Sequence, residues 1–429
     1  MWKNERKKLE AAIGISRNWD AREAGREVVR TAINKLSRPP NFFLLFSTIH
    51  YEKHGGFEAF LNGVWDVLPE GTPLVGGTVA GFMNNYGCYT RGCTALAVSY
   101  SDMDIAVGIG HKTKKNPEKA AVNCANMLKN ELGDSFKNGF IFDLISAGTV
   151  PDIPGMGRRR VLRGLTSKLA IKVSDFSLHI LGKGVGREDE IYDFFIPYFK
   201  DFNILSGSSM DDMKILSNYQ FFNKTVDTNT MVTIGLKSDL KCDINTTYGL
   251  TETGTTFMAT KQTNNNRIIL EINEKPAMKE LLNILGWPEE YINERVYRRI
   301  FYYPIAFKDQ NTFIPQVIGI FLGNSFLTTY RIKNPKIHIL SASGKSLIQA
   351  VEDNINYFSG INPEFGLVSS CGIRLETLGA NVYSVREKLL NFFKDKPFLL
   401  YYVGGEAAYT PKKGLSYGNE SFNMAVFWM

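Results

Sequence analysis

Cys371 and Ser208 are the two side chains that could act as nucleophiles. Cys371 follows the apolar run EFGLVSS and precedes Arg374, whose cationic guanidinium could lower the pKa of a nearby thiol. Neither residue has a GxSxG elbow or a histidine close in sequence. Most cysteines in such runs are small core residues. The sequence therefore assigns no catalytic residue, and a thiol or serine hydrolase-like enzyme remains an alternative interpretation.

Glycine-rich segments end three of the expected strands. They read LVGGTVAG, LSGSSMDD and LYYVGGEAA, and each is followed by a loop and a return strand: GCTALAVSY, TMVTIGLK and SFNMAVF. Glycine allows a positive φ or a close approach of the backbone to a ligand. Tight strand packing in a duplicated fold explains the same glycines equally well. The pattern predicts an internal pseudo-repeat and leaves a ligand site at the strand ends open.

Metal-ligating side chains do not converge in the sequence. Cys88 and Cys93 form a single pair with four residues between them, wider than most zinc ribbons use, and His50 and His54 are not part of an HExxH motif. We therefore predict no metal site. A haem needs only one proximal histidine and leaves little local signature. The histidines formally eligible for that role are His50, His54, His111, His179 and His338.

Phosphate-binding and nucleic-acid motifs are also incomplete. SASGKS, residues 341–346, lies between a strand and a helix, but a phosphate-binding loop needs glycine where Ile339 stands. GKGVGRED lacks the GxGxxG spacing and a following helix, so we expect a loop there. The run RRRVLR, residues 158–163, has no interleaved aromatics and is interpreted as a solvated loop. No nucleic-acid partner is predicted.

The composition is that of a globular protein. Hydrophobic residues make up 44% of the 429 residues and charged residues 22%, which excludes disorder, collagen and coiled coil. The net charge of +7 permits anionic partners without requiring them. Five scattered cysteines favour a reducing compartment, and Arg17 and Asp20 interrupt the only apolar stretch that resembles a signal peptide. We therefore expect a cytoplasmic protein.

The elements that must position these residues are mixed in type. Helices are expected at about 20–36, 56–68, 116–132, 345–358 and 384–393, with strands both between them and in consecutive runs. The uncharged run 310–330 contains Pro315 and two glycines, so we interpret it as two buried strands joined by a turn rather than as a membrane span. The predicted fold class is α+β, with two layered domains of mixed or largely antiparallel sheets flanked by helices.

These segments together resemble the FIST family, whose N-terminal and C-terminal domains form a sensory module of signal transduction. The resemblance rests on IGISRNWDAREAGREV, PLVGGTVAGF, ILSGSSMDD, ILEINEKPAMKEL, GLVSSCGIR and YYVGGEAA, in that order over about residues 10–428. It implies a FIST N-terminal domain at 1–255 and a FIST C-terminal domain at 256–429. The polar segment TETGTTFMATKQTNNN lies at the expected boundary.

The resemblance implies a sensor that binds a small ligand, with amino acids proposed for the family and haem-linked gas sensing in some members. Physically, Arg374 could bind a carboxylate while Glu406 binds an ammonium group; a structural ion pair between the two is the alternative. The family's usual Gly-Gly at the ILSGSS position is Ser206-Gly207 here. The predicted ligand-binding residues are Gly76, Gly77, Gly207, Ser208, Cys371, Arg374, Gly404, Gly405 and Glu406.

The predicted function is therefore small-molecule sensing by a non-enzyme without an obligatory cofactor. No residues remain outside the resemblance for an output module, so we expect a signalling protein partner in trans. A haem-dependent gas sensor, a hydrolase-like enzyme that uses Cys371 or Ser208, and a protein-interaction scaffold are the alternatives.

Overall fold

The computed structural model describes residues 8–133, 138–150, 157–180, 184–293, 295–309 and 312–429. The chain forms three repeat units with the same strand order, and the first, residues 10–99, has its helices where the sequence predicted them. Asp20 accepts a hydrogen bond from the Glu23 backbone N–H and so caps the first helix, as expected for an Asx cap. The elements are β1 (Glu10–Ser16), α1 (Ala21–Ile33), β2 (Phe42–Ser47), η1 (Ile49–Lys53), α2 (Gly56–Trp65), β3 (Leu74–Thr78), β4 (Gly81–Asn84), β5 (Gly87–Tyr89) and β6 (Cys93–Ser99).

The second repeat unit contains two helices, α4 and α5, that the sequence analysis did not predict. Its first helix, α3, begins at Pro117 behind the Asn116 cap, as predicted. Residues 184–187 of the expected loop GKGVGRED are not helical, as predicted, but the expectation that no helix follows was wrong, because α5 begins at Glu188. The elements are β7 (Met103–His111), α3 (Pro117–Glu131), β8 (Asn138–Ser146), β9 (Val161–Leu162), α4 (Gly164–Ile180), α5 (Glu188–Phe195), η2 (Ile196–Tyr198), β10 (Phe202–Ser209), β11 (Gln220–Phe222), β12 (Thr225–Asp227) and β13 (Thr230–Ser238).

The third repeat unit is split by an insertion. Its first helix, α8, starts with a capping box in which the Ser343 and Ser346 side chains exchange hydrogen bonds with each other's backbone N–H, so the SASGKS segment is a helix cap. The elements are β14 (Lys241–Thr247), α8 (Gly344–Tyr357), β23 (Phe365–Cys371), α9 (Ile373–Leu378), η4 (Gly379–Asn381), α10 (Val382–Phe393), β24 (Phe398–Thr410), β25 (Gly414–Tyr417) and β26 (Phe422–Trp428).

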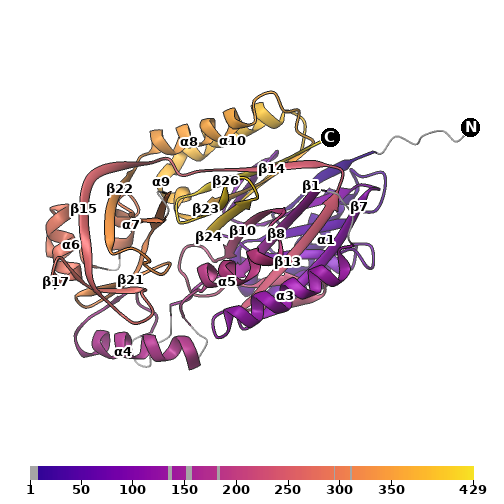
Figure 1. The fold of residues 1–429 in the computed structure, drawn as a ribbon. Helices are drawn as coiled ribbons and strands as arrows, with labels where there is room; N and C mark the ends of the chain where they lie inside the picture. The colour runs from indigo at the N-terminus through magenta and orange to yellow at the C-terminus, as the bar shows by residue number, and fades with distance from the viewer. Residues whose placement is uncertain (1–7, 134–137, 151–156, 181–183, 294, 310–311) are drawn as a thin grey trace, which may run out of the picture.

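The insertion between β14 and α8 forms a lobe around a nine-stranded sheet, to which β9 of the second unit adds an edge strand. Figure 1 shows the lobe at the left, opposite the indigo strands of the first unit. The elements are β15 (Leu250–Gln262), β16 (Ile268–Ile272), β17 (Lys275–Pro276), α6 (Ala277–Leu285), η3 (Glu289–Tyr291), α7 (Val296–Ile300), β18 (Ile305–Asp309), β19 (Thr312–Gln316), β20 (Ile318–Leu322), β21 (Ser325–Thr328) and β22 (Lys336–Ala342).

The three repeat units share one strand order. In the first, β2 pairs parallel with β3 and antiparallel with β6, which pairs with β1. The second repeats this with β8, β10, β13 and β7, and the third with β23, β24, β26 and β14. The predicted pseudo-repeat is therefore confirmed, and it has three full copies.

The units are joined in a ring by exchanged strands. β4 of the first unit pairs with β24 of the third, the second half of β24 pairs with β10 of the second, and β11 of the second pairs with β3 of the first. Each exchanged pairing is antiparallel. As a result, the third strand of every unit contacts another unit, and these are the strands that carry the glycine-rich segments.

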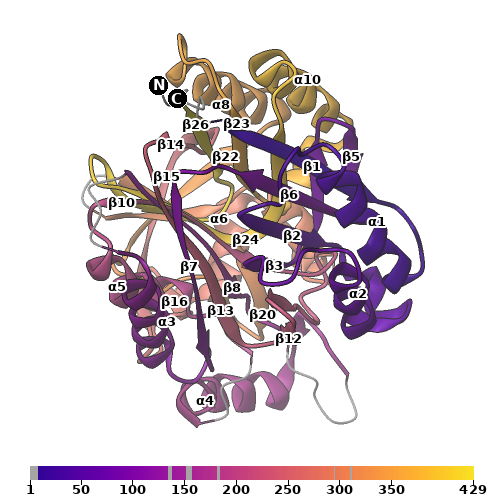
Figure 2. The same cartoon turned by 90° about the vertical axis from the view of Figure 1, so that its right-hand side faces the viewer.

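Helices cover the outer faces of the sheets, and the inner faces share a core. In β2, Phe42, Leu44 and Phe46 enter this shared core, while Phe43 and Leu45 pack against α1 and α2. This explains why the strand FFLLF is apolar at every position. Figure 2 shows α1 and α2 on one side of the first sheet and α3 with α5 beside the strands of the second unit. The layered α+β class is confirmed.

Three further expectations from the sequence concern the uncharged run 310–330, the arginine-rich segment RRRVLR and the domain boundary. Residues 312–328 form three strands with a turn at Gly323 and Asn324, and no helix in the described residues has the length and apolarity needed to span a membrane. In RRRVLR, Arg158, Arg159 and Arg163 are exposed as expected, and Arg158 and Arg163 also donate to the carbonyls of Leu216 and Ile292. The segment is not a loop throughout, because Val161 and Leu162 form β9. The division at 255/256 falls inside the continuous strand β15 and stays a prediction.

Candidate functional site

Four of the nine predicted ligand-binding residues have side chains in one buried polar region between the repeat units and the lobe, and a fifth, Gly405, forms the backbone beside it. The structure adds Glu188 from the start of α5 and Glu420 from the turn before β26. We call this group the buried polar cluster. Its members are Glu188, Ser208, Cys371, Arg374, Glu406 and Glu420, all at most 3% exposed.

The other four predicted residues are glycines with different surroundings. A Cβ added to Gly76 would lie 1.7 Å from the Leu45 carbonyl oxygen, and one added to Gly77 would lie 2.4 Å from the Tyr219 carbonyl oxygen. At Gly207 the neighbour is a Val403 methyl group at 2.8 Å. Close strand packing thus accounts for these three glycines, and their ligand-binding role stays a prediction. Gly404 is beside the cluster in β24.

The strand β24 changes partners at the Gly404-Gly405-Glu406 segment. Up to Val403 it pairs with β23, and from Gly404 it pairs with β10, whose register shifts between Ser206 and Ser208. Gly405 has φ +56°, and a Cβ there would lie 2.5 Å from the Ser208 hydroxyl. This bulge brings Glu406 into the interior beside Cys371.

Gly405→Ala is expected to destabilise the protein by about 1–3 kcal/mol, because alanine is strained in the left-handed backbone conformation and its Cβ also crowds Ser208. Gly404→Ala is the matched control, since only the end of Met210, at 3.9 Å, approaches a Cβ there. Chemical denaturation of both variants measures the difference. Equal midpoints for the two variants would contradict the bulge geometry.

On one side of the cluster, α5 supplies a carboxylate to β10. The Ser208 hydroxyl donates to Glu188 Oε1 at 2.8 Å, while Glu188 Oε2 has no hydrogen-bond partner among the described residues. The Tyr192 hydroxyl, one turn further along α5, donates to the Gly405 carbonyl at 2.9 Å. Burial raises the pKa of Glu188 above its ordinary value. α5 therefore holds both the bulge and a carboxyl group that favours its neutral form.

On the other side, two further glutamates lie in the interior. Glu406 accepts one hydrogen bond from Ser421 at 3.4 Å, and its Oε1 is unpartnered in the described part of the chain. Both side-chain oxygens of Glu420 are likewise unpartnered there. Burial raises the pKa of Glu406 well above its ordinary value and that of Glu420 to about 8. Buried polar atoms nearly always have partners, so these oxygens mark a place where something is expected to bind.

Arg374 is fully buried and serves backbone carbonyls rather than carboxylates. Its guanidinium donates to the carbonyls of Tyr248 at 3.0 Å, Glu420 at 3.1 Å and Leu347 at 2.8 Å, and its Nε alone is unpartnered. The described residues contain no ion pair between Arg374 and Glu406. The guanidinium thus fixes the turn that carries Glu420. Three of its five N–H groups are used, so the Nε–H and one Nη2–H remain for a ligand carboxylate.

The cluster is poorly suited to nucleophilic catalysis. Burial, with the nearby Glu406 and Glu420, raises the pKa of the Cys371 thiol well above its ordinary value, so the thiol stays protonated at neutral pH. The Ser208 hydroxyl donates a hydrogen bond to the Glu188 carboxyl, whose own pKa is raised, and no described histidine is hydrogen-bonded to Ser208. What the arrangement offers is a set of hydrogen-bond acceptors in a dry interior.

A second charged group fixes α5 to the lobe. Arg267, at the start of β16, is 1% exposed and contacts Asp189 Oδ1 at 2.5 Å and Glu190 Oε1 at 3.0 Å. Arg331 contacts the other Asp189 oxygen at 2.8 Å. We call these residues the lobe clamp: Arg267, Arg331, Asp189 and Glu190. Because Asp189 follows Glu188, the clamp connects the lobe directly to the cluster.

Sequence reasoning missed Glu188, Tyr192 and Glu420. The signal for the first two was present: GREDEIYDFF has three acidic residues followed by apolar residues at helical spacing, which is the pattern of a helix start. Glu420 sits in a turn with φ +63°, and no local pattern distinguishes it from a surface glutamate. Its burial depends on β26 joining β23.

The described histidines lie away from the cluster and fit a haem poorly. His50 and His54 pack against Trp19, with His50 Nδ1 hydrogen-bonded to Thr48, while His111 and His338 lie beside Asp227 and Glu252. The side chain of His179 is outside the described residues. Within the described ranges, no three metal-ligating side chains converge. Haem binding stays a prediction without a site.

The family model for the FIST N domain matches residues 41–275, just over half of the chain. The chain belongs to the FIST family. The matched region supplies Glu188, Ser208 and Arg267 to the cluster and the clamp, whereas Cys371, Arg374, Glu406 and Glu420 lie beyond it. FIST domains are sensory domains, which supports a signalling role for this FIST protein. The assignment of a FIST C-terminal domain stays a prediction.

Other comparisons add little for this FIST chain. A cyanuric acid hydrolase from A. caulinodans aligns over 54% of this chain and 72% of that chain, with 8% sequence identity and a TM-score of 0.29. A likeness this low supports no inference about activity. No curated protein matches the chain.

Proposed function

We propose that this FIST protein senses a small ligand that carries an ammonium group or several N–H donors, and that the ligand binds at the buried polar cluster. The observation that carries the proposal is the set of unpartnered carboxylate oxygens on Glu188, Glu406 and Glu420. Leaving such groups buried and unpaired costs stability, and function is the usual reason for tolerating that cost.

The charge balance favours a cationic group. Three glutamates contribute unpartnered acceptor oxygens, whereas Arg374 donates to three carbonyls and keeps two of its five N–H groups. An amino acid would place its ammonium group on the glutamates and its carboxylate near Arg374 Nε. The ammonium end of that assignment has the stronger support, so an amine without a carboxylate is a direct rival ligand.

Sensing requires that the ligand prefer one of two states. The cluster lies beside the lobe clamp, so we propose that ligand binding changes how firmly α5 holds the lobe. Ionisation of the glutamates by a bound cation would alter the charge next to Asp189 and Glu190. A signalling partner in trans would then bind the lobe or α5 preferentially in one state.

The test is a thermal-shift and calorimetric screen that pairs each amino acid with its decarboxylated amine, for example histidine with histamine and ornithine with putrescine. A ligand at one hundred times its Kd stabilises by about 2.7 kcal/mol. Because burial holds the glutamates neutral, binding of a cation should release protons. Calorimetry in two buffers of different ionisation enthalpy measures that release.

Glu406→Gln should abolish binding, since it removes the charge while keeping the shape and the Ser421 contact. Glu131→Gln, at an exposed position at the end of α3, is the control and should bind like the unmodified protein. The proposed site would be refuted if no amino acid and no amine bound the protein. It would also be refuted if Glu406→Gln bound a ligand as tightly as the unmodified protein does. Amines that bind as well as their amino acids would refute the role of Arg374.

A further inference from the structure

We propose that the lobe carries a second binding site, an aromatic pocket that takes a small planar organic anion such as an aromatic carboxylate. The pocket has a volume of about 340 Å³ and opens at the surface between α7 and the end of β22. It lies outside the buried polar cluster. Its main lining residues are Trp287, Tyr291, Arg299, Tyr302, Tyr303 and Ser341.

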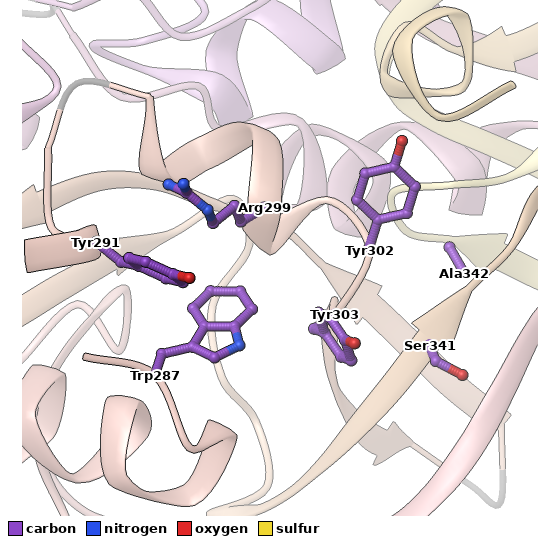
Figure 3. Close-up of a pocket in the computed structure, with 7 residues that line it drawn as sticks. All are labelled: Trp287, Tyr291, Arg299, Tyr302, Tyr303, Ser341 and Ala342. Carbon is purple, nitrogen blue, oxygen red and sulfur yellow. The ribbon is translucent and has the colours of Figure 1, made fainter. Parts of the chain in front are cut away.

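The rings are held in place by the local backbone. α6 ends at Gly286, which has φ +65°, and the following Trp287 N–H bonds back to the Leu282 carbonyl at 2.9 Å. The Trp287 ring then lies between two tyrosines, with centroids 5.6 Å from Tyr303 and 6.1 Å from Tyr291 (Figure 3). These aromatic side chains therefore form a defined wall for a flat ligand.

The wall remains exposed. Tyr302 and Tyr303 are 40% and 38% exposed, respectively. Large aromatic side chains scattered singly over a surface need no explanation, but four that line one hollow indicate a binding surface. Their ring faces offer stacking area, and the tyrosine hydroxyls make no side-chain hydrogen bond to any described residue. The pocket therefore presents both apolar faces and free hydrogen-bonding groups.

The charge of the pocket selects an anion. Arg299 is the single charged residue among the described lining residues, and its guanidinium lies 4.0 Å from the centroid of the Tyr291 ring. Arg299 has no carboxylate within ion-pair distance among the described residues, whereas its neighbour Arg298 contacts Glu376 at 3.3 Å. Stacking on Tyr291 orients the planar guanidinium, which matches the two oxygens of a carboxylate. A cationic ligand would meet this positive charge and is disfavoured.

The size of the pocket limits the occupant. Ligand pockets commonly run from about 300 to 1,000 Å³, so this one is at the small end. One or two fused rings with a carboxylate fit within this volume. Trp287 and Tyr303 would stack on the ring while Arg299 binds the carboxylate.

The experiment uses 4-hydroxybenzoate and indole-3-acetate as probes with the full chain, followed by saturation-transfer NMR and calorimetry. Binding of at least one acid, with no binding of benzamide, benzylamine or acetate at the same concentration, is the expected result. Arg299→Gln should weaken that binding by about tenfold or more. Arg295→Gln, one helical turn earlier and absent from the pocket lining, is the matched control and should retain it.

Two results would overturn the proposal: no binding of either acid at millimolar concentration, or binding that Arg299→Gln leaves unchanged. Trp287→Phe keeps a ring and should retain part of the affinity, while Trp287→Ala should lose it. Thermal melts of each variant report folding. Glu406→Gln should bind the probes normally, which separates this pocket from the proposed amine site.

Discussion

Arg267→Met is expected to lower the free energy of unfolding by about 3–5 kcal/mol, because it leaves the buried Asp189 without its main counter-charge. The Arg267 and Asp189 side chains are each 1% exposed, and their contact is 2.5 Å long. Arg267 and Arg331 together hold the pKa of Asp189 below its ordinary value despite its burial. Removing one partner leaves an uncompensated charge in the interior. Urea denaturation measures the loss.

The same substitution should loosen the lobe before it unfolds the repeat units. Limited proteolysis should therefore cut between β14 and α8 sooner in Arg267→Met than in the unmodified protein. Lys261→Met is the control, because Lys261 forms an exposed pair with Glu271 in the same lobe and should change stability by less than about 1 kcal/mol. Equal midpoints for the two variants would show that the clamp contributes nothing.

Glu420→Gln is expected to stabilise the protein at pH 8 and to change it little at pH 5. The folded-state pKa of Glu420 is about 8, above the ordinary value near 4.5, so the folded chain binds a proton that the unfolded chain releases. Below about pH 4, Glu420 is protonated in both states and does not lower the free energy of unfolding. As the pH rises from there to 8, the free energy of unfolding falls, because only the folded chain still holds the proton. A shift of this size corresponds to a few kcal/mol, on the order of 4.

The measurement is urea denaturation of Glu420→Gln and of the unmodified protein at steps from pH 5 to 8. Glu420 makes no side-chain hydrogen bond to a described residue, so glutamine removes the titration without removing a contact. Asp143, with a pKa raised to about 7 by burial, contributes a slope in the same direction, as do Glu188 and Glu406 with their raised pKa values, and the variant keeps these contributions. The exposed control Glu131→Gln should follow the unmodified protein. A pH slope unchanged by Glu420→Gln would refute the assignment.

Local patterns predicted most individual elements. Asp20 and Asn116 each begin a helix where the sequence predicted a helix start, and FFLLFS and GLVSSC are buried strands as their composition indicates. Such features depend on a few neighbouring residues. The glycine-rich segments likewise predicted a repeat, because each copy keeps its own strand end and return strand.

Features that depend on distant partners were not predictable from those patterns. The ring of exchanged strands exists only because β4, β11 and β24 pair with other units. Arg374 was expected to bind a carboxylate, yet it donates to three carbonyls supplied by separate parts of the chain. Glu420 is buried for the same reason. The candidate site therefore combines residues that the sequence singled out with others that only the packing places there.

The exchanged strands also constrain how the protein is made. Gly81 in β4 pairs with Tyr402 in β24, so β4 cannot join its sheet until nearly the whole chain has left the ribosome. Pairing across such long sequence separations slows folding, because the chain loses loop-closure entropy before the stabilising contacts form. Until then the nascent first unit exposes the open edges of β3 and β4. We therefore expect the newly made chain to depend on chaperones during synthesis.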